Sequence, residues 1–139
     1  MRILALSPSD MTTEATLEGL RSLPGHEVSI YRYDKRGLPV DRGMIDVAAM
    51  TRPNLIVYIG QNNAPFLAAE TTFHHLKTIC PTVLLCFDAS DKTWTPLLTD
   101  YRDHDTFSLI VSIDGNDAWP ARAEIDYTAL TPIAVEFYV

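Results

Sequence analysis

The chain has few cysteines, no surplus of basic residues and no long apolar run. Only two of its 139 residues are cysteines, Cys80 and Cys86, which is too few for a disulfide framework. It carries 11 Lys and Arg against 18 Asp and Glu, a formal charge of −7, so it lacks the positive surplus that attracts nucleic acid or anionic membranes. No apolar stretch approaches the roughly 20 residues that span a bilayer. The opening MRILALSP is too short to be the apolar core of a signal peptide. These absences favour a cytoplasmic chain without nucleic acid or membrane as a partner.

The composition is that of a globular protein. Apolar residues make up 47% of the chain, close to the usual share. A chain of this length forms one domain and buries a substantial core. We therefore treat residues 1–139 as a single domain.

Short apolar runs alternate with amphipathic stretches. Strands are predicted at residues 2–7, 27–33, 55–59, 82–87 and 107–113. Helices are predicted at about residues 11–23, 41–50 and 64–77, and residues 93–105 are interpreted as irregular or weakly helical. This alternation predicts an α/β fold. We expect a Rossmann-like, doubly wound, mostly parallel sheet of about five strands with helices on both faces.

Doubly wound sheets bind ligands outside the carboxyl ends of their strands. Four predicted loops lie there, at residues 7–10, 60–63, 88–91 and 114–117. Gly60 permits close approach of a ligand, and the amides of Gln61, Asn62 and Asn63 both donate and accept hydrogen bonds. They suit sugar hydroxyls or a peptide. The alternative is that Asn62 or Asn63 caps the next helix.

Two further loops carry hydroxyls and carboxylates. Ser9 and Asp10 follow the first strand without the glycines of a dinucleotide loop. Helix capping is the simpler interpretation for them, although a helix N-terminus also contacts polar ligands. After the fourth strand, Asp88 is a candidate general base beside Ser90, and Asp91 is a weaker one. Solvated or capping carboxylates are the alternative.

No metal site is predicted. The adjacent His74 and His75 cannot form an i,i+4 ligand pair, and the Asp-His-Asp run at 103–105 has no second ligand group at a recognised spacing. We interpret the histidines as polar surface residues. Cys86 is expected to pack in a strand as a small hydrophobic residue.

A phosphoacceptor receiver is also disfavoured by the sequence. Such a domain needs a carboxylate at the end of its third strand, where this chain reads Tyr-Ile-Gly-Gln at residues 58–61. Its usual lysine after the fifth strand is missing too, because Asp114 follows Ile113. The phosphate loop of flavodoxins and the G-x-S-x-G elbow of α/β-hydrolases are absent as well.

Three segments resemble glycosyltransferases of the GT-B fold, of the spore-maturation type. PTVLLCFD at 81–88 is similar to a strand-plus-acid segment of that family, and FSLIVSIDG at 107–115 resembles its next strand with an Asp-Gly exit. LTPIAVEFY at 130–138 resembles the stretch that leads into the C-terminal half. The opening strand also fits.

The resemblance implies an acceptor-binding N-terminal domain. A GT-B enzyme has a second domain that binds the nucleotide-sugar donor, and it works without a bound metal or other cofactor in this half. The implied partners are a sugar-acceptor substrate and, through the absent C-terminal domain, that donor. Asp88 and Asp114 are then the candidate catalytic bases. Because a complete enzyme is much longer, residues 1–139 would be half of a two-domain protein and inactive alone.

Two other interpretations remain open. The first is a non-catalytic, small-ligand-binding or regulatory module of Rossmann or flavodoxin shape, which needs only the fold and the loop at 60–63. The second is a structural half that docks on a partner or forms a homodimer through the apolar residues 133–139.

Overall fold

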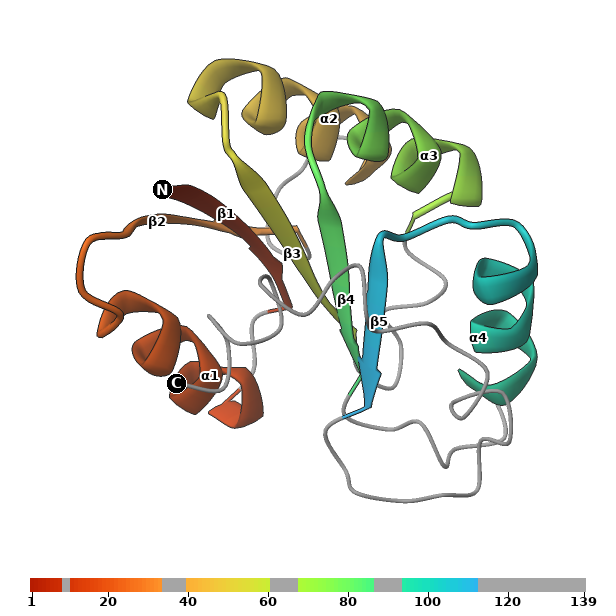
Figure 1. Ribbon diagram of the computed structural model, residues 1–139, viewed down its shortest axis with the longest axis horizontal. Coiled ribbons are helices and arrows are strands. Elements are labelled where there is room, and N and C mark those ends of the chain that lie inside the picture. The colour runs from red at the N-terminus through yellow and green to blue at the C-terminus, as the bar shows by residue number, and fades with distance from the viewer. Residues whose placement is uncertain (9–10, 34–39, 61–67, 87–93, 113–139) are drawn as a thin grey trace.

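The sheet and its helices appear in the computed structural model, which describes residues 1–8, 11–33, 40–60, 68–86 and 94–112 (Figure 1). The elements in chain order are β1 (Arg2–Ser7), α1 (Met11–Arg21), β2 (Glu27–Arg32), α2 (Val40–Thr51), β3 (Leu55–Gly60), α3 (Glu70–Ile79), β4 (Thr82–Cys86), α4 (Trp94–Asp103) and β5 (Leu109–Ser112). The strands form one sheet in the order β2-β1-β3-β4-β5, and each neighbouring pair is parallel. The predicted α/β class and the parallel sheet of about five strands are confirmed.

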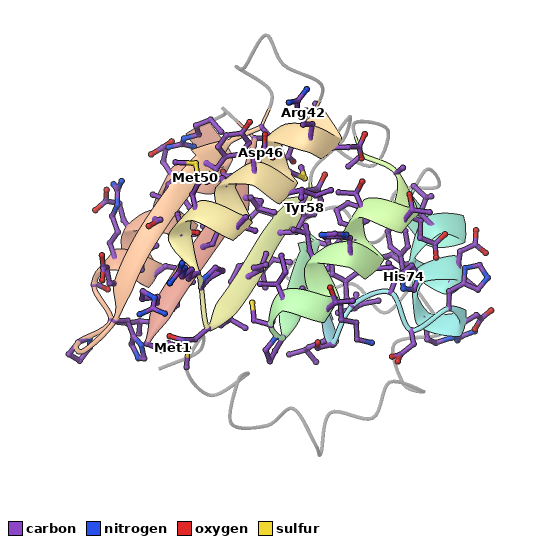
Figure 2. The ribbon with its side chains drawn as sticks, turned by 90° about the horizontal axis from the view of Figure 1, so that it is seen from above. Met1, Arg42, Asp46, Met50, Tyr58 and His74 are labelled. Atoms are coloured by element: carbon purple, nitrogen blue, oxygen red, sulfur yellow. The ribbon has the colours of Figure 1, made fainter. Side chains whose placement is uncertain are left out.

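Each face of the sheet has its own apolar cluster, because alternate strand residues point to opposite faces. One cluster packs the sheet against α2, α3 and α4, which lie over the same face (Figures 1 and 2). Its strand residues include Leu4, Tyr58 and Leu84. The other packs residues such as Val57 against Leu17 of α1. Helices therefore cover both faces, as expected for a doubly wound sheet.

Burial follows the position of each strand in the sheet. Every residue of β3 and β4 is buried, as their nearly continuous apolar sequences predict for strands covered on both faces. The edge strand β2 is only partly buried. Before β2 the chain turns at Gly25, whose φ of +79° suits glycine. Within the described ranges, no helix combines the length and apolar character needed to cross a bilayer.

Two helices differ from the prediction. The predicted helix at about 64–77 is α3, which begins only at Glu70, because Ala69 before it has extended backbone angles. The stretch that was interpreted as irregular contains a regular helix, α4. Burial of Leu98 and Tyr101 against the sheet stabilises α4 despite its weak apolar pattern. The last described strand, β5, begins at Leu109 and not at Phe107 as predicted, although Phe107 is buried in the core.

Candidate functional site

The strand order locates the topological switch point between β1 and β3. The chain passes from β1 to α1 on one face, and from β3 to α3 on the other. Open α/β sheets bind ligands at the carboxyl edge beside such a point. Ser7 ends β1 there, Gly60 ends β3, and Cys86 of β4 pairs with Gly60. These residues define the candidate site.

An arginine lies over the end of β1. The Nη1 atom of Arg32, at the end of β2, donates to Oγ of Ser7 at 3.4 Å and to the carbonyl oxygen of Pro8 at 3.2 Å. Its Nη2 pairs with Glu14 of α1 at 2.5 Å. The buried Ser7 hydroxyl donates to the Pro8 carbonyl at 2.9 Å. The guanidinium therefore links β1, β2 and α1 and supplies a positive charge at this edge.

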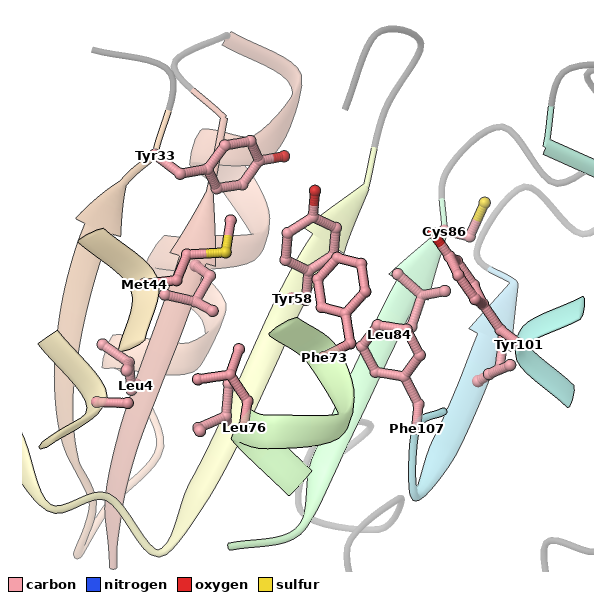
Figure 3. Packing of buried hydrophobic residues seen from close by; sticks show 14 of the residues in the cluster. Leu4, Tyr33, Met44, Tyr58, Phe73, Leu76, Leu84, Cys86, Tyr101 and Phe107 are labelled. Carbon is pink, nitrogen blue, oxygen red and sulfur yellow. The ribbon is translucent and has the colours of Figure 1, made fainter. Parts of the chain in front are cut away.

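Two tyrosines pack in the apolar core near the carboxyl end of β3. The rings of Tyr33 and Tyr58 stack with centroids 5.2 Å apart, and both are buried (Figure 3). The Tyr33 hydroxyl donates to the carbonyl oxygen of Ile59 at 2.8 Å. Burial raises the pKa of Tyr58 far above its ordinary value, although its hydrogen bond with Tyr33 acts in the opposite direction. The Tyr58 hydroxyl is therefore uncharged at physiological pH.

The end of β3 offers no acid. Residues 58–61 are Tyr-Ile-Gly-Gln, so an acyl phosphate cannot form in this stretch. The charged groups that the described residues place at the β1 and β2 ends are Arg32 and Glu14, which pair with each other. The charges of this described pair therefore offset each other at the edge.

The nine candidate residues from sequence are only partly placed. Gly60 is the last, buried residue of β3 and lies at the switch point, and its ligand-binding role stays a prediction. The remaining candidates lie outside the described residues, namely Ser9, Asp10, Gln61, Asn62, Asn63, Asp88, Ser90 and Asp114. Their roles stay predictions. Cys86 is fully buried in β4, which confirms its interpretation as a packed thiol.

A second polar group lies at the start of α3. Asp41 of α2 accepts hydrogen bonds from the Ala69 backbone at 2.8 Å and from the Thr72 hydroxyl at 2.6 Å. Glu70 accepts from Thr106 and contacts His104, both at 2.7 Å. The interpretation of the histidines as mere surface residues missed these contacts. The only signal in the sequence was the Asp-His-Asp run at 103–105, since the partners are 28 to 36 positions apart.

Metal binding finds no support in the described part of the chain, where no group of three or more His, Cys, Asp or Glu side chains is arranged to hold an ion.

The strand order β2-β1-β3-β4-β5, with α1 on one face and α2, α3 and α4 on the other, defines a flavodoxin-like or receiver-like α/β fold. Among solved structures, the chain is similar to the response regulator domain of CheB from Thermotoga maritima. The TM-score is 0.61 and the sequence identity 11%, with 100% of this chain and 97% of that chain covered. At this identity the likeness concerns the fold. No protein-family model and no curated protein sequence matches the chain.

The glycosyltransferase prediction is wrong. Over its whole length the chain matches a receiver domain and not a GT-B half, so the acceptor-binding role, the sugar acceptor and the nucleotide-sugar donor are withdrawn. The segments at 81–88 and 107–115 misled because each contains a buried strand of a parallel sheet followed by a polar exit. That pattern occurs throughout doubly wound folds and does not discriminate among them.

Proposed function

We propose that the chain is a non-catalytic regulatory module of receiver shape, which acts by binding a partner protein and accepts no phosphoryl group at the end of β3. One observation carries the proposal. The architecture matches a response regulator domain along the whole chain, whereas residues 58–61 contain no carboxylate. The fold supports the regulatory role, and the missing acid argues against phosphotransfer as its trigger.

The surroundings of Gly60 support the same conclusion. Near the end of β3 the ring of the neutral Tyr58 stacks on that of Tyr33, and Arg32 at the end of β2 is already paired with Glu14. Neither arrangement supplies an acid at the end of β3 that could accept a phosphoryl group. The proposal places the chain in the cytoplasm, consistent with two free cysteines, and treats residues 1–139 as one domain.

Exposure to a phosphoryl donor tests the proposal. The whole chain is incubated with acetyl phosphate and Mg²⁺, and its intact mass is measured by mass spectrometry. We expect an unchanged mass under conditions that phosphorylate a receiver domain with its acid in place. A gain of one phosphoryl group that hydroxylamine removes would reveal an acyl phosphate and overturn the proposal.

A matched variant shows what the missing acid contributes. Gln61→Asp places a carboxylate directly after β3 without altering the strand. If the fold alone were sufficient for phosphotransfer, the natural chain and this variant would gain equal mass. Under the proposal the natural chain gains none, and a mass gain confined to the variant would show that the missing acid is what prevents phosphorylation.

Small-ligand binding at the switch point is a second candidate function. It is favoured by the position of Gly60 beside Ser7 and by the amides at 61–63 that follow in the sequence. Because Arg32 lies at this edge, inorganic phosphate is the first probe. Saturable shifts of the Ser7 and Gly60 amide resonances would support the candidate, and unchanged resonances at millimolar phosphate would count against it.

A further inference from the structure

A polar cluster joins α3 to the turn between α4 and β5. Oε1 of Glu70 accepts a hydrogen bond from Oγ1 of Thr106 at 2.7 Å and lies 2.7 Å from Nδ1 of His104. Since a carboxylate only accepts, the His104 nitrogen donates. Thr106 is fully buried, whereas the His104 side chain is 57% exposed. We call Glu70, His104 and Thr106 the α3 latch.

A separate contact holds the same turn to the other end of α3. Nζ of Lys77 donates to the carbonyl oxygen of Asp105 at 2.7 Å and pairs with Oδ2 of that residue at 2.8 Å. Asp105 has a φ of +53°, a left-handed conformation that Asp tolerates better than most residues. This contact involves no imidazole, so protonation of a histidine does not break it.

The α3 latch lies next to the aromatic core. Thr106 is followed by Phe107, whose ring centroid lies 4.9 Å from that of Phe73 on α3. Phe73 packs edge-on against Tyr58 at 4.8 Å, and Tyr58 stacks on Tyr33 at the end of β3 (Figure 3). A continuous row of packed rings therefore runs from the latch to the stacked tyrosines near the candidate site.

The charge on Glu70 is maintained by its partners. Burial acts to raise its pKa, but the hydrogen bonds from Thr106 and His104, together with the charges of His104 and His74, hold that pKa below its usual value. Nε2 of His74 is 3.6 Å from the same carboxylate oxygen. Tyr101 also faces Glu70, and burial raises its pKa to about 12, so it stays neutral.

The charge on His104 is favoured by acids on two helices. Its hydrogen bond to Glu70 and the charge of Glu70 raise the pKa of the imidazole, and Asp100 and Asp103 of α4 add to this effect. Arg102 pairs with Asp103 at 2.7 Å and partly offsets that acid. In the folded chain the imidazolium therefore persists to higher pH than in an unfolded chain.

We propose that Glu70 and His104 form a protonation-controlled latch, which holds the α4–β5 turn against α3 when His104 is charged and loosens when it is neutral. The charge-assisted bond is stronger than the neutral one that replaces it. Because the pKa of His104 is raised, its contribution is complete below the unfolded-state value near 6.5 and is lost as the pH rises through the folded-state value. On the acid side it is lost as the pH falls through the lowered pKa of Glu70. This inference does not depend on the proposed function.

Hydrogen exchange of the whole chain, followed by NMR, tests the latch. The reporter is the Thr106 amide, which donates to the carbonyl oxygen of Tyr101 within the held turn. After correction for intrinsic exchange, we expect opening to be about two- to fivefold more frequent at weakly alkaline than at weakly acidic pH, the range expected for surface ion pairs. Equal opening at both pH values would overturn the proposal.

Three variants assign the effect to the latch. His104→Gln keeps a neutral donor and should abolish the pH difference, whereas His75→Gln, on the exposed side of α3, should preserve it. Lys77→Gln should increase opening at both pH values while the difference remains. Persistence of the difference in His104→Gln, or its loss in Lys77→Gln, would overturn the proposal. Because His104 is half exposed, its replacement should leave the fold intact.

Discussion

The first turn of α3 is capped by a side chain from another helix. Oδ1 of Asp41, on α2, accepts from the Ala69 backbone at 2.8 Å and from the Thr72 hydroxyl at 2.6 Å. Ala69 is the N-cap residue and has no polar side chain to fill this role. Asp41→Ala therefore removes the cap and also the acceptor of Thr72, which is only 5% exposed. We predict a measurable loss of stability at a residue outside the apolar core.

The size of the loss follows from the two contacts. Removing an N-cap acceptor costs about 1 kcal/mol. Leaving a buried hydroxyl without its acceptor costs about another 1 kcal/mol. We therefore expect Asp41→Ala to lower the free energy of unfolding by about 2 kcal/mol. Asp41→Asn keeps an acceptor oxygen and removes only the charge near the helix N-terminus, so it should cost about 0.5 kcal/mol.

Urea denaturation measures both variants, and α2 offers a matched control. Asp46 pairs with Arg42 at 3.7 Å on the same helix, and both side chains are more than half exposed (Figure 2). Asp46→Ala should cost less than about 0.5 kcal/mol. Equal losses for Asp41→Ala and Asp46→Ala would refute the capping argument. An equal loss of stability in Asp41→Asn and Asp41→Ala would also refute it.

Three further predictions, two on packing and one on helix propensity, are checked by the same denaturation assay. Phe73→Ala should cost about 3–5 kcal/mol, because the ring is 1% exposed and contacts three other aromatic rings. A loss below about 1 kcal/mol would contradict the close packing of Phe73 in the aromatic core. Gly43→Ala should cost about 1–3 kcal/mol, since its new methyl group would collide with the Tyr31 side chain. Gly19→Ala, with open space around it in α1, should instead stabilise the chain by up to about 1 kcal/mol, and a loss there would count against the helix.

The fold could be predicted from sequence because the strands are apolar and short. Leu55–Gly60 and Thr82–Cys86 are buried on both faces, so their nearly unbroken apolar runs are a direct signature of central parallel strands. The helix boundaries were harder to predict from sequence. The backbone N–H of Ala69, just before α3, donates to Asp41, which lies 28 positions earlier in the chain, whereas the sequence predicted a helix from about residue 64. No local pattern carries that information.

The contacts of the α3 latch could not be predicted from local sequence patterns for the same reason. Glu70 and His104 are 34 positions apart and meet only because α3 packs beside the turn after α4. That turn could not be anticipated while α4 itself was interpreted as irregular. The position of Gly60 could be predicted from sequence. It directly follows the apolar run 55–59, and the end of a strand lies at the carboxyl edge of the sheet in any doubly wound fold.

The family resemblance failed where it relied on patterns shared by many folds. An apolar run followed by an acid, as in 81–88, is typical of buried strands in many doubly wound folds and does not single out a glycosyltransferase. The missing carboxylate at 58–61 was the more specific observation, because it concerns one chemical group at one position. It excluded phosphoacceptor chemistry at that position without excluding the receiver architecture, and the distinction between the two now underlies the proposed function.

The most direct test of that function is made at the end of β3 itself. Beryllium fluoride with Mg²⁺ mimics a phosphoryl group on a receiver carboxylate, and NMR follows the amides of Gly60 and its neighbour across the sheet, Cys86. A module without the acid should show unchanged resonances for both residues at saturating reagent. Saturable shifts of these two resonances would place an acceptor carboxylate beside β3 and contradict the account.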